Sequence, residues 1–227
     1  MRFYVALLVS MMAPAIGYAA ESTSDAVAAY NKKDYPAAVA IFARQGQKGD
    51  AFAQTFLGWM YDNGEGVPDD DAEATHWWRL AAEQGHPKAQ VFLGVRYVNG
   101  NGIAKDPVEA VKWYRRAADQ GYAKGQSNLA GMYAAGTGVT KDFVEAAKWY
   151  LLAAAQGDLK AQSALGGMFE KGEGVAKDFI QAYKWFSLAA AQGSDQALKA
   201  KQALTKQMTS DQVDQAGKLV ASWQLNH

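Results

Sequence analysis

A period of 36 residues constrains the fold of this chain more than any other feature of its sequence. Tryptophan and glycine recur at that interval over four consecutive units, residues 53–88, 89–124, 125–160 and 161–196. The recurring residues are Trp77, Trp113, Trp149 and Trp185; Gly64, Gly100, Gly136 and Gly172; Gly66, Gly102, Gly138 and Gly174; and Gly85, Gly121, Gly157 and Gly193. A unit of this length cannot bury its own apolar face and must stack on its neighbours. The sequence therefore predicts one elongated array of repeats.

Each unit carries the signals for two helices joined by a glycine turn. In the second unit the pattern predicts a first helix, helix A, over 89–99, a turn at 100–102 and a second helix, helix B, over 106–120. Asp106 and Glu109 predict a capping box, in which an N-cap carboxylate and a side chain three residues later each accept the other's backbone N–H. Gln120-Gly121 predicts the end of helix B, because glycine adopts the left-handed conformation without a Cβ penalty. The corresponding boxes are Asp70 with Glu73, Asp142 with Glu145 and Asp178 with Gln181.

One face of each helix is constant from unit to unit. On helix A the constant residues of the first unit are Ala53, Leu57, Gly58 and Tyr61, which share one side of a helical wheel. On helix B, bulky aromatic residues alternate with alanine, a pattern typical of closely interlocked helices. We expect the repeated tryptophans to be core residues rather than a ligand site.

The ends of the array depart from the pattern. Residues 24–52 are a shortened copy that lacks both loop glycines, and residues 197–224 predict two capping helices. Lys201 and Gln202 replace the apolar packing positions of helix A, as expected of a cap. The last helix carries four apolar residues on one side, which could cover the exposed end of the stack. These are Val213, Ala216, Val220 and Trp223.

The amino terminus has the composition of a secretory signal. Arg2 precedes an apolar run over 3–12 and a segment of small residues over 14–20, which predicts a signal peptide at residues 1–19. An uncut membrane anchor is the alternative, although the apolar run is short for a membrane span. The absence of cysteine excludes a lipoprotein signal. We therefore expect a periplasmic or secreted product with no stable membrane span after cleavage.

The composition excludes several function classes. Lys and Arg number 23, as do Asp and Glu, so no net charge favours nucleic-acid binding. The chain contains no cysteine, which removes thiolate nucleophiles and cysteine-based metal sites. The three histidines, His76, His86 and His227, have no carboxylate at metal-ligand spacing, and we expect them to be surface residues. The sequence thus predicts no metal, no cofactor and no enzyme activity.

The repeated motif resembles a known family. Its elements are Ala-x-x-x-Leu-Gly-x-x-Tyr, Gly-x-Gly-Val/Ile, Lys-Asp, and Ala-x-Lys-Trp-Tyr-x-x-Ala-Ala-x-Gln-Gly. Together they resemble the Sel-one-like repeat family, a 36-residue variant of the tetratricopeptide theme, strongly over 53–196 and weakly over 24–52. The resemblance implies an all-α fold, a right-handed α/α superhelical solenoid whose A helices line a concave surface. It also implies an adaptor, assembly factor or exported regulator that binds proteins or peptides.

The candidate binding site lies on the side of helix A that varies between units. Phe56, Trp59 and Phe92, flanked by Asn63 and Arg96, could anchor an apolar side chain or peptide. The alternative is that Phe56 and Phe92 merely pack against the neighbouring repeat. Smaller residues at the same positions of later units would leave room for a bound backbone.

Two other functions stay open. Export together with aromatic residues on a concave face suggests a glycan-binding or cell-wall module with peptidoglycan as its ligand. A cysteine-rich branch of the same family is associated with binding or hydrolysis of β-lactams, but its disulfide framework is missing here. A protein or peptide partner is the reading that we favour.

Overall fold

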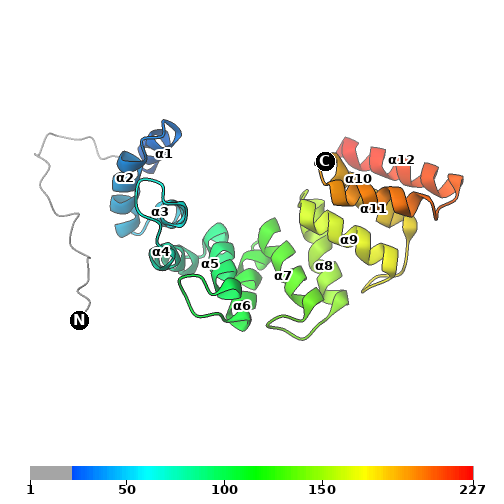
Figure 1. The fold of residues 1–227 in the computed structure, drawn as a ribbon, viewed down its shortest axis with the longest axis horizontal. Coiled ribbons are helices and arrows are strands. Elements are labelled where there is room, and N and C mark those ends of the chain that lie inside the picture. Colours follow the sequence, from blue (N-terminus) through cyan, green and yellow to red (C-terminus); the bar gives the residue numbers. More distant parts are fainter. Residues whose placement is uncertain (1–21, 227) are drawn as a thin grey trace, which may run out of the picture.

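The fold is an α/α solenoid, as the sequence predicts. The structure is a computed structural model that describes residues 22–226, so the predicted signal peptide and His227 lie outside the described residues. Residues 22–226 form twelve helices and no strand, and consecutive helices pair into hairpins that follow one another along an arc (Figure 1). None of these helices is long and apolar enough to cross a bilayer.

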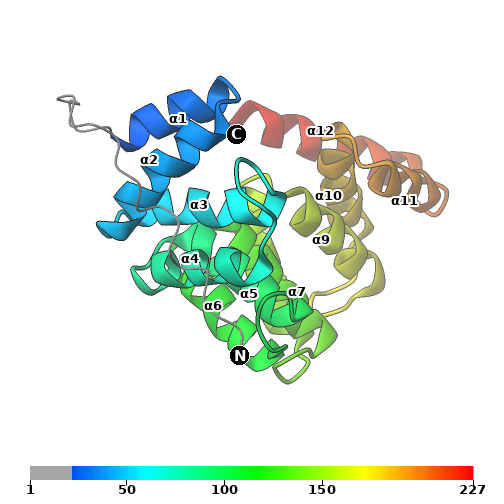
Figure 2. The same ribbon diagram turned by 60° about the vertical axis from the view of Figure 1, so that its left-hand side comes forward.

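Four regular hairpins make up the centre of the arc. They are α3 (Ala51–Asn63) with α4 (Asp71–Glu83), α5 (Pro87–Asn99) with α6 (Pro107–Asp119), α7 (Ala123–Ala135) with α8 (Phe143–Ala155), and α9 (Leu159–Lys171) with α10 (Phe179–Ala191). A shorter hairpin of α1 (Thr23–Asn31) and α2 (Tyr35–Gln47) precedes them, and α11 (Asp195–Thr205) and α12 (Ser210–Asn226) follow. The ends of the arc overlap in Figure 2 but lie well apart in Figure 1.

The A helices line the inner side of the arc. Two pairs of successive A helices touch directly, α5 with α7 and α9 with α11, as expected of elements on the inside of a curve. Each B helix packs between its own A helix and the next one, and this packing buries the repeated aromatics. Trp113 and Trp185 are buried, whereas Trp77 and Trp149 are partly buried against the apolar clusters of their own junctions between repeats. The prediction that the tryptophans are core residues is confirmed.

Helix B begins at the predicted aspartate, but the predicted capping box is only half formed. The Asp106 carboxylate accepts the N–H groups of Val108 and Glu109, both at 3.0 Å. The N–H of Asp106 itself donates to the carbonyl of Tyr97 in the preceding helix, at 2.8 Å, rather than to Glu109. The same bond joins Asp70 to Tyr61, Asp142 to Tyr133 and Asp178 to Phe169. The prediction that the residue three positions later accepts the aspartate N–H is therefore wrong. That N–H donates instead to a carbonyl of the preceding helix.

Helix A of the second unit begins two residues earlier than the sequence predicts, at Pro87. Its N-cap is His86, whose Nδ1 accepts the N–H of Ala89 at 3.4 Å. Asp50 and Asp158 cap the equivalent helices through a carboxylate. The caps escape a search for repeated residues because their chemical type changes from unit to unit.

The second loop glycine sets the distance between repeats. Gly102 has a φ of +64°, and a Cβ added there would lie 2.0 Å from the carbonyl oxygen of Asp71, the first residue of the preceding helix B. Gly138 and Gly174 meet the first residues of α6 and α8 in the same way, Pro107 and Phe143, at 2.2 and 2.0 Å. No side chain fits between these backbones. Glycine is therefore required for close approach as well as for its backbone conformation.

A glutamine network joins neighbouring repeats in the interior. Gln90 is buried on α5, where its amide nitrogen donates to the Ala82 carbonyl at the end of α4, at 3.2 Å. Its amide oxygen accepts from Gln120, the C-cap residue of α6, at 2.8 Å. The equivalent pairs are Gln84 with Gln54, Gln156 with Gln126 and Gln192 with Gln162. Each buried glutamine thus ties the ends of two successive B helices to the A helix between them.

The last helix packs on α10 rather than on its sequence neighbour α11. The rings of Trp223 and Trp185 lie 5.2 Å apart, and the Lys184 ammonium lies 3.9 Å from the centroid of Trp223. Lys112 and Lys148 occupy the same position as Lys184 in the two preceding repeats. Their side chains are each 62% exposed. Helix α12 therefore covers the outer side of the last full repeat, and α11 is left as the end of the stack.

We expect Gly102→Ala to lower the free energy of unfolding by more than Gly121→Ala. Both glycines have a positive φ, but a Cβ at Gly121 would meet nothing within 4 Å. The left-handed conformation alone costs about 1–2 kcal/mol in a residue other than glycine, and Gly102→Ala adds a backbone clash. Urea unfolding followed by circular dichroism measures both variants. Equal losses would contradict the close-approach argument.

Replacing Gln90 with leucine should destabilise the chain by about 1–3 kcal/mol, because it removes from a buried position both the side-chain donor to the Ala82 carbonyl and the acceptor of Gln120. The matched control is Gln202→Leu at an exposed position of α11, which we expect to change the unfolding midpoint little. A midpoint for Gln90→Leu equal to that of the control would show that the network adds no stability.

Candidate functional site

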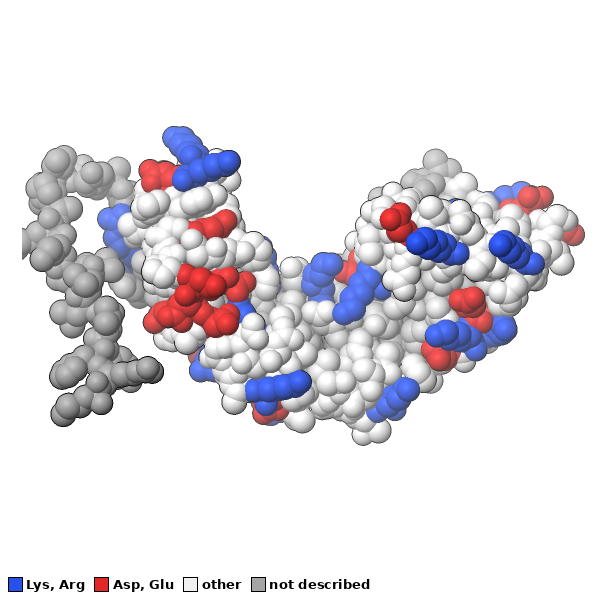
Figure 3. Space-filling view, in the orientation of Figure 1, with Lys and Arg blue, Asp and Glu red and all other residues white. Residues whose placement is uncertain are grey.

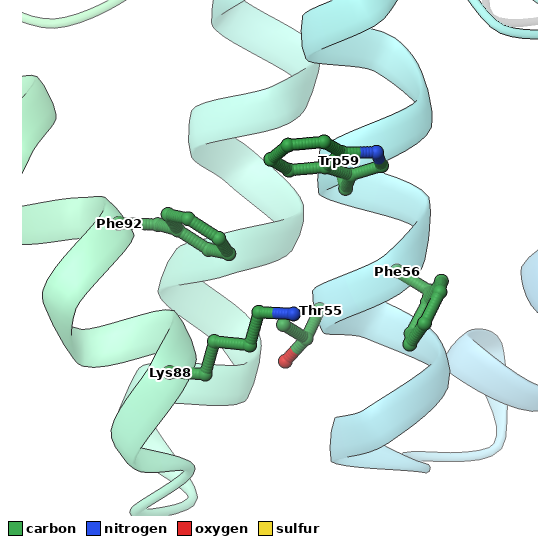
Figure 4. Close-up of a pocket in the computed structure, with 5 residues that line it drawn as sticks. All are labelled: Thr55, Phe56, Trp59, Lys88 and Phe92. Atoms are coloured by element: carbon green, nitrogen blue, oxygen red, sulfur yellow. The ribbon is translucent and has the colours of Figure 1, made fainter. Parts of the chain in front are cut away.

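A pocket between α3 and α5 brings together the three aromatic residues predicted as an anchor. Phe56 and Trp59 from α3, and Phe92 from α5, line an open pocket of about 300 Å³ with Thr55 and Lys88 (Figure 4). Part of this space is open solvent, and the comparable cavity volume of about 70 Å³ lies well below the range for ligand pockets, about 300–1,000 Å³. The pocket therefore has room for one large side chain rather than for a whole folded element.

The walls of the pocket are fixed by packing between repeats. Phe56 stacks on Phe42 of α2 with ring centroids 5.1 Å apart and an interplanar angle of 17°. Phe92 packs against Trp78 of α4 at 4.7 Å. Each of these two rings thus packs with one part of its surface against the preceding hairpin, as the alternative interpretation of Phe56 and Phe92 predicted. The remainder of each ring faces the pocket.

Trp59 is the exposed member of the aromatic group. Its side chain is 37% exposed, and its ring lies 5.9 Å from that of Phe92 across the pocket. Phe52, 42% exposed, extends the apolar surface from the other side and lies 4.7 Å from Phe56. An exposed indole beside a partly filled pocket is a surface that a partner could bury at little cost in side-chain entropy.

The structure adds Lys88 to the site, a residue that the sequence analysis did not include. Its ammonium lies 5.6 Å from the centroid of Phe56 and 5.7 Å from that of Phe92 (Figure 4). Lys88 is exposed, and no carboxylate of the described residues lies within 4.0 Å of it. Its position one helical turn before Phe92 was the available sequence signal. The pocket therefore combines apolar walls with one cation.

Asn63 and Arg96, predicted to flank the anchor, do not line the pocket. The Asn63 amide donates to the carbonyl of Trp59 at 2.7 Å, near the end of α3. Arg96 is buried and forms ion pairs with Asp62 and, at 2.8 Å, with Asp71. Burial lowers the pKa of the Arg96 guanidinium from its ordinary value. Arg96 thus links α3, α4 and α5 beneath the surface.

His86 lies beneath the pocket, and the prediction that it is a surface residue is wrong. It is half-buried, and its Nδ1 lies 3.0 Å from the hydroxyl of Thr55, which in turn donates to the Ala51 carbonyl at 2.7 Å. Burial lowers the pKa of His86, the positive charge of Lys88 lowers it further, and the carboxylate of Asp50 opposes both effects. A neutral imidazole at this position matches its role as the N-cap of α5.

Beyond the pocket, the side chains on the inner surface are smaller and more of them are basic. At Gly167 of α9, equivalent to Trp59, an added Cβ would meet open space. Lys124 pairs with the buried carboxylate of Asp158 at 2.9 Å, and Lys160 donates to the Asn128 amide oxygen at 3.3 Å. Figure 3 shows basic atoms in the floor of the hollow, over α7 and α9, and acidic atoms over α4. The hollow is thus apolar at one end and basic at the other.

No group of three potential metal ligands occurs within residues 22–226. The pocket offers apolar contact, aromatic faces and one ammonium group, which are features of recognition by shape and charge.

The four regular hairpins match a known family of repeats. The family model of the Sel1 repeat matches residues 51–86, 87–122, 123–158 and 159–194, and each match starts at the first residue of an A helix. The chain belongs to the Sel1 repeat family. Sel1 repeat proteins are scaffolds that generally mediate protein–protein interaction, so membership favours a binding role. No match was found among curated proteins.

Solved Sel1 structures share the architecture. A protective antigen of uropathogenic Escherichia coli with an SLR fold is 40% identical over 70% of this chain, with a TM-score of 0.68. This chain spans only 34% of that antigen. A Sel1 repeat protein from Oxalobacter formigenes is 32% identical and has a TM-score of 0.71, with 83% of this chain and 86% of that one covered. A Sel1 repeat protein from Klebsiella pneumoniae, 22% identical with a TM-score of 0.52, shares the fold alone.

We expect the chain to lose stability as the pH falls from about 7.5 to about 5.5. The unfolded chain protonates His86 near pH 6.5, whereas the folded chain holds its pKa lower, so protons favour the unfolded state in this window. Replacing His86 with asparagine, a good N-cap, should reduce the loss, whereas replacing the exposed His76 with asparagine should leave it unchanged. Urea midpoints at the two pH values measure it. An unaltered loss in His86→Asn would exclude His86 as its source.

Proposed function

We propose that this Sel1 repeat protein is an exported scaffold or regulator that binds a protein or peptide partner through the inner surface formed by its A helices. The observation that carries the proposal is the exposed Trp59 beside a pocket whose other walls are already fixed by packing. Rigid aromatic groups of this kind are typical of the few residues that dominate binding energy at interfaces.

The packing beneath the pocket supports binding rather than a purely structural role for the aromatic group. Phe56 and Phe92 are held by Phe42 and Trp78, so they lose little conformational freedom when a partner arrives. Trp59 and Phe52 are the exposed aromatic residues of this surface, at 37% and 42%. A partner that inserts one apolar side chain here would contact all three rings at once.

Export is part of the proposal and rests on the composition of residues 1–19. A periplasmic or secreted location is consistent with the absence of cysteine, because the repeats are held together by packing and buried hydrogen bonds instead of disulfides. We further propose that the protein acts by binding, without catalysis, cofactor or metal.

The test is crosslinking and affinity capture in cells with the mature chain, run beside Trp59→Ala and a matched control, Leu198→Ala. Leu198 is a similarly exposed apolar residue on α11, 39% exposed, far from the pocket along the arc. Loss of an interface residue of this kind typically costs about 2 kcal/mol or more, so we expect recovery of one protein to fall at least about tenfold with Trp59→Ala alone.

Recovery of the same protein at the same level with all three chains would place the binding surface elsewhere. Recovery of peptidoglycan fragments in place of a protein would favour the glycan-binding alternative, which the exposed indole of Trp59 also suits. Circular dichroism should show the helical content of the native chain in both variants, because both residues are partly exposed and neither belongs to a buried core cluster.

A further inference from the structure

We infer that the pocket between α3 and α5 selects a peptide segment in which an acidic side chain stands next to a large apolar one, with Lys88 as the residue that reads the acid. This inference rests on the proposed peptide-binding function and specifies the chemistry of the partner. The apolar side chain would occupy the pocket, and the carboxylate would pair with the Lys88 ammonium at its rim.

The hydrogen-bonding capacity of the pocket points to a ligand that accepts. The Thr55 hydroxyl donates to the Ala51 carbonyl and also contacts His86. The indole nitrogen of Trp59 points away from Phe92, and the phenylalanines have no polar atoms (Figure 4). Among the residues that line the pocket, Lys88 alone has donors that no acceptor within the described part of the chain uses. An anionic acceptor makes the strongest bond to an ammonium group.

The lysines equivalent to Lys88 in the next two repeats differ from it in having partners. Lys124 and Lys160 occupy the same repeat position, 36 and 72 residues later. Lys124 pairs with Asp158, and Lys160 donates to Asn128. Both groups lie on the inner surface but already have partners within the chain. At Lys88 the residues equivalent to Asp158 and Asn128 are Tyr122 and Phe56, so neither a carboxylate nor an amide stands in those positions.

The geometry fixes how far the carboxylate can lie from the apolar side chain. The ammonium is at almost equal distances from the rings of Phe56 and Phe92, 5.6 and 5.7 Å, so it stands over the same opening that the apolar group must enter. The two groups of the ligand must therefore come from adjacent or nearly adjacent residues. Acidic residues over α4 disfavour further negative charge on that side, which should limit the motif to one acid (Figure 3).

A specificity switch tests the inference. A phage-displayed library of random peptides is selected on the immobilised mature chain, on Lys88→Glu, and on Lys160→Glu, which makes the same charge change two repeats away. We expect the native chain and Lys160→Glu to enrich peptides with an aromatic or large aliphatic residue next to Asp or Glu. Lys88→Glu should instead enrich Lys or Arg at the acidic position, because the charge that it presents is reversed.

A cycle with one selected peptide measures the pairing. Changing its acid to the matching amide should weaken binding to the native chain about tenfold and leave binding to Lys88→Gln unchanged. Enrichment of apolar residues without an acid, or an equal response of both chains to the amide peptide, would overturn the inference and leave the proposed function standing. Failure to enrich any peptide whose binding Trp59→Ala abolishes would overturn the proposed function as well.

Discussion

The close approach of one repeat's loop to helix B of the preceding repeat sets the geometry on which the rest of the structure depends. The second loop glycine lies against the first residue of the preceding helix B, with no space for a Cβ. Since the contact is between backbones, its length is nearly independent of the side chains around it. Repeats with different inner surfaces can therefore stack at the same spacing, and this constancy allows the A helices to diversify without disturbing the array.

The buried glutamines reinforce the same register by a different means. A buried amide must satisfy both its donor and its acceptor, and each one does so with partners on two successive B helices. A shift of one repeat along the next would break both bonds at once. The network is thus more sensitive to register than apolar packing, which tolerates small displacements. Together the glycine contacts and the glutamine network fix the register between repeats without disulfides.

The candidate site depends on this frame. Its rings come from two A helices, and each ring is held by an aromatic residue of the hairpin before it, Phe42 beneath Phe56 and Trp78 beneath Phe92. A binding pocket therefore forms at the junction of repeats rather than within one. The same junction places His86, the cap of α5, under the pocket, so the proton affinity of a structural residue is linked to the charge of Lys88 above it. Site and scaffold are parts of one packing arrangement.

The sequence by itself determined the repeat length, the two helices per unit, the N-cap aspartates of helix B and the aromatic core, because these depend on local spacing and on a pattern repeated four times. It also singled out Phe56, Trp59 and Phe92, since they lie on the variable side of helix A. Only the tertiary structure decided how the ends of the elements are bonded. The N–H of Asp106 meets a carbonyl of another helix, Arg96 forms buried ion pairs, and Lys88 has no acceptor among residues 22–226. Such outcomes depend on which groups of neighbouring repeats come within hydrogen-bonding distance. The spacing of residues along the sequence does not specify these distances in space.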